Sequence, residues 1–137
     1  MYPKGKQILV IDGEARRRRL SERVLRDEGF EVTAVAEGFS AIVAAANTRF
    51  ALAIVAAQLP GSLDGVATLR QIRSRQPWVK ALFTGEAASR PARLHHDRDD
   101  FIASPLQRRE LLGCVFELLQ RGGTHDPADC RDHGAAG

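Results

Sequence analysis

Short apolar runs separated by amphipathic segments constrain the fold of this chain more than any other feature. Residues 7–11 (QILVI) are apolar without alternation, which is typical of a strand covered on both faces in a parallel sheet. We predict five strands, at residues 7–11, 31–35, 50–55, 79–83 and 100–103. Because strands and helices alternate along the chain, the sequence predicts an α/β fold: a doubly wound parallel sheet with helices on both faces.

Helical spacing follows most of these strands. In residues 15–28, Leu20 and Val24 recur four positions apart among arginines and glutamates, as on the buried face of a helix. Similar patterns predict helices at residues 39–46, 66–76 and 107–121. Residues 86–100 contain Pro91 and a cluster of polar side chains, so we expect only a short or frayed helix there.

Composition excludes several classes of protein. The chain has 137 residues, 44% of them apolar and 27% charged, which fits one globular domain. It has no apolar stretch near the ~18 residues of a membrane span, and the apolar run after the basic N-terminus is too short for a signal peptide. Cys114 falls among apolar residues and Cys130 does not, so we expect two thiols in a reducing cytoplasm rather than a disulfide framework.

Small and polar residues follow the predicted strands. Asp12, Gly13, Ala56, Thr84 and Ser104 all lie just past the end of a predicted strand. In doubly wound folds the site lies at the carboxyl ends of the strands, where the strand order reverses. We therefore expect these positions to meet around one pocket.

Five short motifs carry a resemblance to a known family. They are residues 8–12 (ILVID), 59–61 (LPG), 64–65 (DG), 83–85 (FTG) and 101–105 (FIASP). Over residues 7–121 the chain resembles the receiver domain of response regulators in bacterial two-component signalling. The resemblance implies a flavodoxin-like sheet with strand order 2-1-3-4-5. We expect an arm at 1–6 before this domain and a flexible tail at 122–137 after it, because the tail has almost nothing to bury.

In that family an aspartate accepts a phosphoryl group while Mg²⁺ neutralises the charge that gathers on the oxygens. The resemblance assigns the acceptor to Ala56 and the metal-binding acidic pair to Asp12 and Gly13. It assigns the hydroxyl group to Thr84 and the lysine to Ser104, before a proline expected to be cis. Since a methyl group is not a nucleophile, the resemblance implies the fold of the family but not phosphoryl transfer to position 56.

The absent groups form a coherent set. Clustered carboxylates need a cation to coexist, so without two of them neither Mg²⁺ nor a lysine has much to bind. Asp12 with Glu14 is the remaining candidate for a metal site, but it lacks a third oxygen. We therefore expect no metal, no cofactor and no enzymatic activity, and an atypical receiver that acts by protein–protein contact. In this interpretation Asp12 and Thr84 have structural roles. The Asp12 carboxylate orders the following loop, and the Thr84 hydroxyl caps the end of a strand.

Two alternatives remain open. A receiver with another acceptor would use Asp64 or Glu14, although Asp64 lies eight residues past Ala56. A small-ligand module would use the neutralised pocket. Residues 16–19 (RRRR) suggest nucleic acid, but four charges on a helix are more typical of a solvated face, so we do not expect that partner.

The last strand and helix are the expected partner face. Phe101 is predicted to be a core or half-core aromatic, with Arg108 and Arg109 exposed on the helix beside it. A homodimer through this face is left open. Histidine, aspartate and cysteine in the tail lack fixed spacing, and His95 with His96 falls in a polar loop, so neither group predicts a metal site.

Overall fold

The computed structural model describes residues 5–121 and contains a five-stranded sheet with four α-helices. The strands are β1 (Gln7–Ile11), β2 (Glu31–Val35), β3 (Leu52–Ala56), β4 (Lys80–Gly85) and β5 (Asp99–Ala103). The helices are α1 (Ala15–Asp27), α2 (Gly38–Asn47), α3 (Gly65–Arg75) and α4 (Arg108–Gln120). The predicted tail and Cys130 lie outside the described residues.

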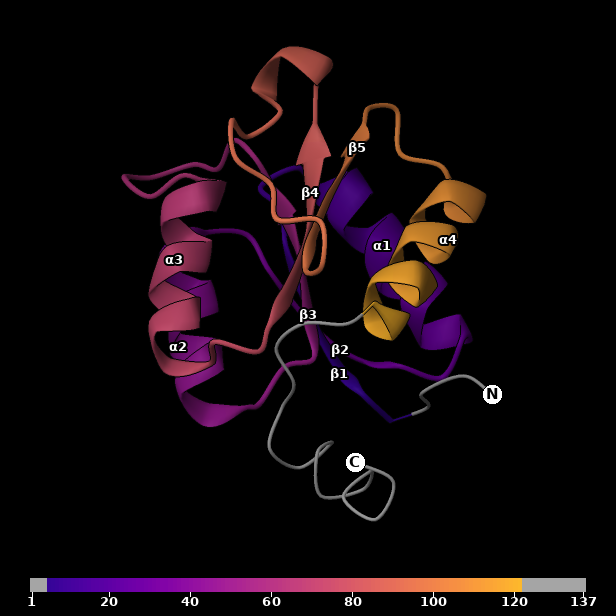
Figure 1. Cartoon of the computed structure of the whole chain (residues 1–137), viewed down its shortest axis with the longest axis horizontal. Coiled ribbons are helices and arrows are strands. Elements are labelled where there is room, and N and C mark those ends of the chain that lie inside the picture. Colours follow the sequence, from indigo (N-terminus) through magenta and orange to yellow (C-terminus); the bar gives the residue numbers. More distant parts are fainter. Residues whose placement is uncertain (1–4, 122–137) are drawn as a thin grey trace.

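The strands are all parallel and follow the order β2-β1-β3-β4-β5. Figure 1 shows α2 and α3 on one side of the sheet and α1 and α4 on the other. This is the predicted flavodoxin-like, doubly wound architecture, and it is confirmed. Among residues 5–121 no helix is both long and apolar enough to cross a membrane.

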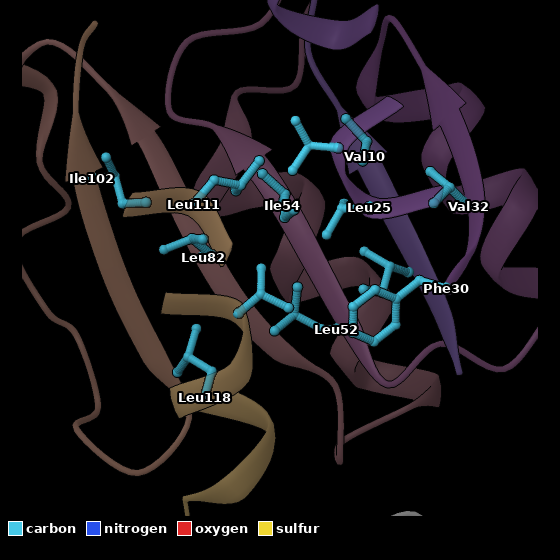
Figure 2. Close-up of a cluster of buried hydrophobic side chains, with 13 residues drawn as sticks. Val10, Leu25, Phe30, Val32, Leu52, Ile54, Leu82, Ile102, Leu111 and Leu118 are labelled. Carbon is cyan, nitrogen blue, oxygen red and sulfur yellow. The ribbon is translucent and has the colours of Figure 1, made fainter. Parts of the chain in front are cut away.

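Side-chain alternation along the strands builds two cores. Ile8 and Val10 of β1 point toward α1 and α4, where they join the cluster drawn in Figure 2. Leu9 and Ile11 point to the opposite face and pack beneath α2 and α3. Each fully buried aliphatic side chain contributes roughly 1.5–3 kcal/mol of hydrophobic stabilisation, so both helical layers are firmly held to the sheet.

β3 lies at the centre of the sheet and is buried at every position from Leu52 to Ala56. It begins two residues later than predicted, and the Phe50 N–H donates to the side-chain oxygen of Gln76 at 2.9 Å instead of joining the ladder. Its far end places Ala56 between the ends of β1 and β4. The middle of the carboxyl edge is therefore occupied by a methyl group.

The connection between β4 and β5 contains only one turn of 3-10 helix, Ala87–Ser89. Figure 1 shows the chain beyond this turn descending in front of β4 toward the start of β5. Leu94 of this connection and Phe101 of β5 pack, partly buried, against the core beneath α2 and α3. The short or frayed helix expected from the sequence is thus a single turn, and irregular backbone flanks α3.

The end of α4 is anchored to the sheet by two basic side chains. Lys80 at the start of β4 is 6% exposed, and its ammonium donates to the carbonyls of Leu118 and Arg121 at 2.5 Å each. The Arg121 guanidinium in turn donates to the carboxylates of Asp100 (3.1 Å) and Glu117 (2.6 Å). Cations near a helix C-terminus also interact favourably with the helix dipole.

Candidate functional site

The carboxyl ends of the strands surround a cavity of about 220 Å³. Its lining, which we call the strand-end cavity, consists of Arg17, Ala56, Gln58, Thr84, Gly85, Glu86, Ser89 and Ser104. Three of the five positions predicted to meet here, Ala56, Thr84 and Ser104, line it directly. Asp12 does not line the cavity but is bonded to Arg17, which does. Gly13 packs against Pro60 in the loop after β3.

Asp12 is the remaining acid of the predicted pair, and an arginine holds it. Nε and Nη2 of Arg17 donate to the two carboxylate oxygens at 2.6 and 2.9 Å, in a bidentate pair. The side chain of Asp12 is only 6% exposed, whereas that of Arg17 is 30% exposed and borders the cavity. The hydrogen bond to Asp12 raises the pKa of Arg17, so the guanidinium stays charged and fixed beside this carboxylate.

The loop after β1 is tied down by further bonds to the same residue. The Glu14 N–H donates to Asp12 Oδ1 at 2.9 Å, and Nη1 of Arg18 donates to the Asp12 carbonyl at 2.8 Å. Two arginines of the run at 16–19 therefore donate hydrogen bonds to the same aspartate. The prediction that this run is a solvated face is therefore wrong for Arg17 and Arg18, which are half-buried.

Glu14 caps α1 with its side chain. Its carboxylate accepts the N–H groups of Arg16 at 2.9 Å and Arg17 at 3.1 Å. These two bonds, led by the one from Arg16, lower the pKa of Glu14. Within residues 5–121 no group of three or more histidines, cysteines or acidic residues is arranged to hold a metal ion.

Gly13 is packed against Pro60 of the loop after β3. A Cβ added at position 13 would lie 2.6 Å from Pro60 Cδ, which is closer than real Cβ atoms approach other atoms. The position that the resemblance assigns to the second acid thus has no space for a side chain unless that loop moves.

Ala56 and Thr84 are ladder partners on neighbouring strands. The N–H of Ala57 donates to the Thr84 carbonyl at 2.8 Å, which fixes the backbone at this corner of the cavity. Thr84 is 2% exposed, and no other described residue hydrogen-bonds its hydroxyl. The cavity wall therefore contains the methyl group of Ala56 and the Thr84 hydroxyl, which is available for a hydrogen bond.

Two further predicted positions take structural roles near the cavity. Asp64 caps α3, since its Oδ1 accepts the Ala67 N–H at 2.8 Å. Ser104 donates its backbone N–H to the Gly85 carbonyl at 2.7 Å and precedes a cis peptide bond to Pro105, as expected. Its side chain is exposed at the rim of the cavity.

The burial predicted for the last strand and helix is confirmed, but Phe101 and α4 lie on opposite sides of the sheet. Phe101 is half-buried against the core beneath α2 and α3, with the guanidinium of Arg90 stacked 5.6 Å from its ring centre. Arg108 and Arg109 are exposed, and Arg108 lies 3.8 and 3.7 Å from the carboxylates of Asp27 and Glu28 on α1.

Cys114 is the one cysteine that lies within residues 5–121. It packs half-buried against the core beneath α1 and α4, as expected of a small hydrophobe. Burial is the main cause that raises its pKa to about 11, so the thiol is protonated at neutral pH.

The fold and the arrangement of strand ends define a receiver-like α/β domain, and comparison with known proteins gives its family. The sequence matches the response regulator receiver domain over residues 8–116, and the chain belongs to that family. It is 33% identical over 117 residues to the transcriptional regulatory protein ResD of Bacillus subtilis, covering 84% of this chain and 48% of ResD. The chain therefore spans about half the length of that relative.

Solved structures give the same family. NtrX from Brucella abortus superimposes with a TM-score of 0.77 at 28% identity, over 85% of this chain and 27% of NtrX. The receiver domain of a sensor histidine kinase from Pseudomonas aeruginosa PAO1 superimposes with a TM-score of 0.71 at 26% identity, over 84% of this chain and 98% of that domain. The latter structure holds a magnesium ion in its active-site cleft.

Proposed function

We propose that this receiver domain works in two-component signalling without aspartyl phosphate and without Mg²⁺, as a cytoplasmic protein-interaction module. The bidentate pair between Asp12 and Arg17 carries the proposal. A guanidinium already supplies the positive charge that the carboxylate requires, and it occupies both oxygens that would face a cation. The magnesium-bound receiver of Pseudomonas aeruginosa is similar in fold and serves as the contrast.

Phosphoryl transfer requires a nucleophile, a metal and a cationic group to hold the transferred oxygens. At the corresponding strand ends this chain has the methyl of Ala56, the Asp12–Arg17 pair and the hydroxyl of Ser104. Asp64 and Glu14, the alternative acceptors, each accept backbone N–H groups at a helix start. We therefore assign no catalytic residue, and the domain acts by contact with a protein partner.

The partner surface that we propose includes β5 and α4, with Phe101, Arg108 and Arg109. Lys80 and Arg121 fix the C-terminal end of α4 to the sheet, which supports a rigid helix in this surface. A second copy of the chain is one candidate for the partner, and sedimentation analysis of the isolated domain tests it.

The main test is titration of the ¹⁵N-labelled protein with beryllofluoride and Mg²⁺, followed by amide chemical shifts. We expect no saturable shift at Asp12, Ala57 or Thr84. A Mg²⁺-dependent, saturable shift at those amides would overturn the proposal. Mass spectrometry after incubation with acetyl phosphate tests the alternative acceptors, since a phosphorylated Asp64 or Glu14 would require a conventional relay function.

The strand-end cavity supports one second candidate, the binding of a small polar molecule. It is lined by Gln58, Ser89 and Ser104, whose side chains, like the Thr84 hydroxyl, have no hydrogen-bond partner among residues 5–121. A volume of about 220 Å³ suits a molecule smaller than the usual drug-sized ligand. A thermal-shift screen of small polar metabolites tests this candidate, with Thr84→Val as the matched variant that keeps the shape and removes the hydroxyl.

A further inference from the structure

Half-buried arginines in this domain have acceptors for their guanidinium groups, with one exception. Five arginines are half-buried: Arg17, Arg18, Arg73, Arg98 and Arg121. Four of them donate to a carboxylate or a carbonyl. Arg98 has no side-chain acceptor among residues 5–121, and its Nε is fully covered without a partner. A covered donor without an acceptor is unfavourable in a folded protein, and more so when the group is charged.

Arg98 lies in the turn before β5, beside a second cavity of about 460 Å³. We call this the arginine cleft, and its lining consists of Val66, Arg70, Arg73, Ser74 and Arg98. The cleft separates α3 from the irregular connection between β4 and β5. It has three guanidinium groups in its wall and no acidic residue.

The carboxylate beside the cleft is already engaged. Arg73 donates to Asp99 Oδ1 at 2.7 Å and to the Val79 carbonyl at 2.9 Å, while the other oxygen of Asp99 accepts the His95 N–H at 2.9 Å. Neither Arg70 nor Arg98 has an ion-pair partner in the described part of the chain. The pKa of Arg73 is lowered, chiefly by burial, and the positive charge of Arg98 adds to the effect. The cleft therefore carries unneutralised positive charge.

We propose that the arginine cleft binds a carboxylate side chain of an acidic peptide segment in a partner protein, held between Arg70 and Arg98. The forked guanidinium is suited to bidentate carboxylates. Two features favour a peptide over a simple anion. The cleft is several times larger than a small ion requires, and Val66, 37% exposed, offers an apolar contact beside the charges. This site is separate from the strand-end cavity and does not depend on how that cavity functions.

The test uses a short peptide in which two glutamates precede a leucine, and a twin peptide with glutamines in their place. Binding to the full chain is followed by calorimetry and by the ¹⁵Nε–H signal of Arg98. We expect the acidic peptide to bind and to shift that signal, and the twin to bind at least tenfold more weakly. The double variant Arg70→Gln/Arg98→Gln should lose at least tenfold in affinity.

A matched double variant, Arg16→Gln/Arg19→Gln, removes the same charge from exposed positions on α1 and should keep the affinity. Equal loss in both double variants would mean non-specific attraction and would overturn the proposal. Displacement of the peptide by inorganic phosphate at equal ionic strength would also overturn it, because the cleft would then accept any small anion. Arg98→Lys, which keeps the charge without the fork, should bind several-fold more weakly, and unchanged affinity would contradict the bidentate contact.

Discussion

Two aspartate–arginine pairs lie at opposite ends of the sheet and use the same chemistry for different purposes. Asp99 and Arg73, at the start of β5, are 7% and 14% exposed and join α3 to the sheet. Asp12 and Arg17, at the end of β1, are 6% and 30% exposed, and the arginine borders the strand-end cavity. The first pair is buried between α3 and the start of β5. The second pair is partly exposed and lies beside the strand-end cavity.

The two pairs therefore differ in what the loss of one partner exposes. An enclosed pair holds the fold, and loss of one partner leaves a buried charge. A pair at a cavity holds a loop, and its loss frees a carboxylate toward solvent. Substitutions in the two pairs should therefore differ in both stability and metal binding.

Breaking the enclosed pair should have the largest effect. Asp99→Ala removes the acceptor for Arg73 and for the His95 N–H, and we expect a loss of about 3 kcal/mol in the free energy of unfolding. Urea denaturation measures it, with Asp97→Ala as the exposed neighbouring control. A loss below about 1 kcal/mol would mean that the pair is not enclosed in solution.

Breaking the cavity pair should have a smaller effect on stability. For Arg17→Gln we expect a loss of about 1–2 kcal/mol, because the arginine is partly solvated and water can replace it at Asp12. The control is Arg16→Gln, which removes the same charge one residue away and makes no ion pair with Asp12. If the two variants are equally stable, the Asp12–Arg17 pair does not stabilise the fold.

The cavity pair also predicts a change in metal binding. Ala56→Asp alone should bind Mg²⁺ weakly, because Arg17 still holds Asp12. Ala56→Asp combined with Arg17→Gln should bind it at least tenfold more tightly, a difference of about 1.4 kcal/mol. Isothermal titration with MgCl₂ measures both. If the single variant binds as tightly as the double variant, the guanidinium does not exclude the metal.

The smallest effect concerns Glu14 and pH. Hydrogen bonds lower its pKa in the folded protein, so its stabilising contribution is present above the unfolded value of about 4.5 and is lost as the pH falls through the folded value. The stability difference between the wild type and Glu14→Gln should therefore shrink as the pH falls below about 4.5. Glu37→Gln is the matched control, since Glu37 begins α2 without a side-chain capping bond. A difference that is constant with pH would contradict the prediction.

The sequence was sufficient for the order and number of the strands, and the predicted bounds 7–11 and 31–35 match β1 and β2. It was also sufficient for Ala56, Thr84 and Ser104, since parallel topology brings these strand ends together. It did not reveal that Arg17 turns back onto Asp12, because the first turn of a helix can direct a side chain to the loop or to water. Nor did it reveal the arginine cleft, whose residues come from α3 and from the irregular connection before β5.

The contact between Gly13 and Pro60 limits the order in which substitutions can accumulate at this edge. Any side chain introduced at position 13 meets Pro60 while the loop after β3 keeps its present place. A second acid could therefore become established only after, or together with, a change that moves that loop. The packing therefore couples position 13 to the loop after β3, and an acidic substitution at position 13 alone should destabilise the folded chain.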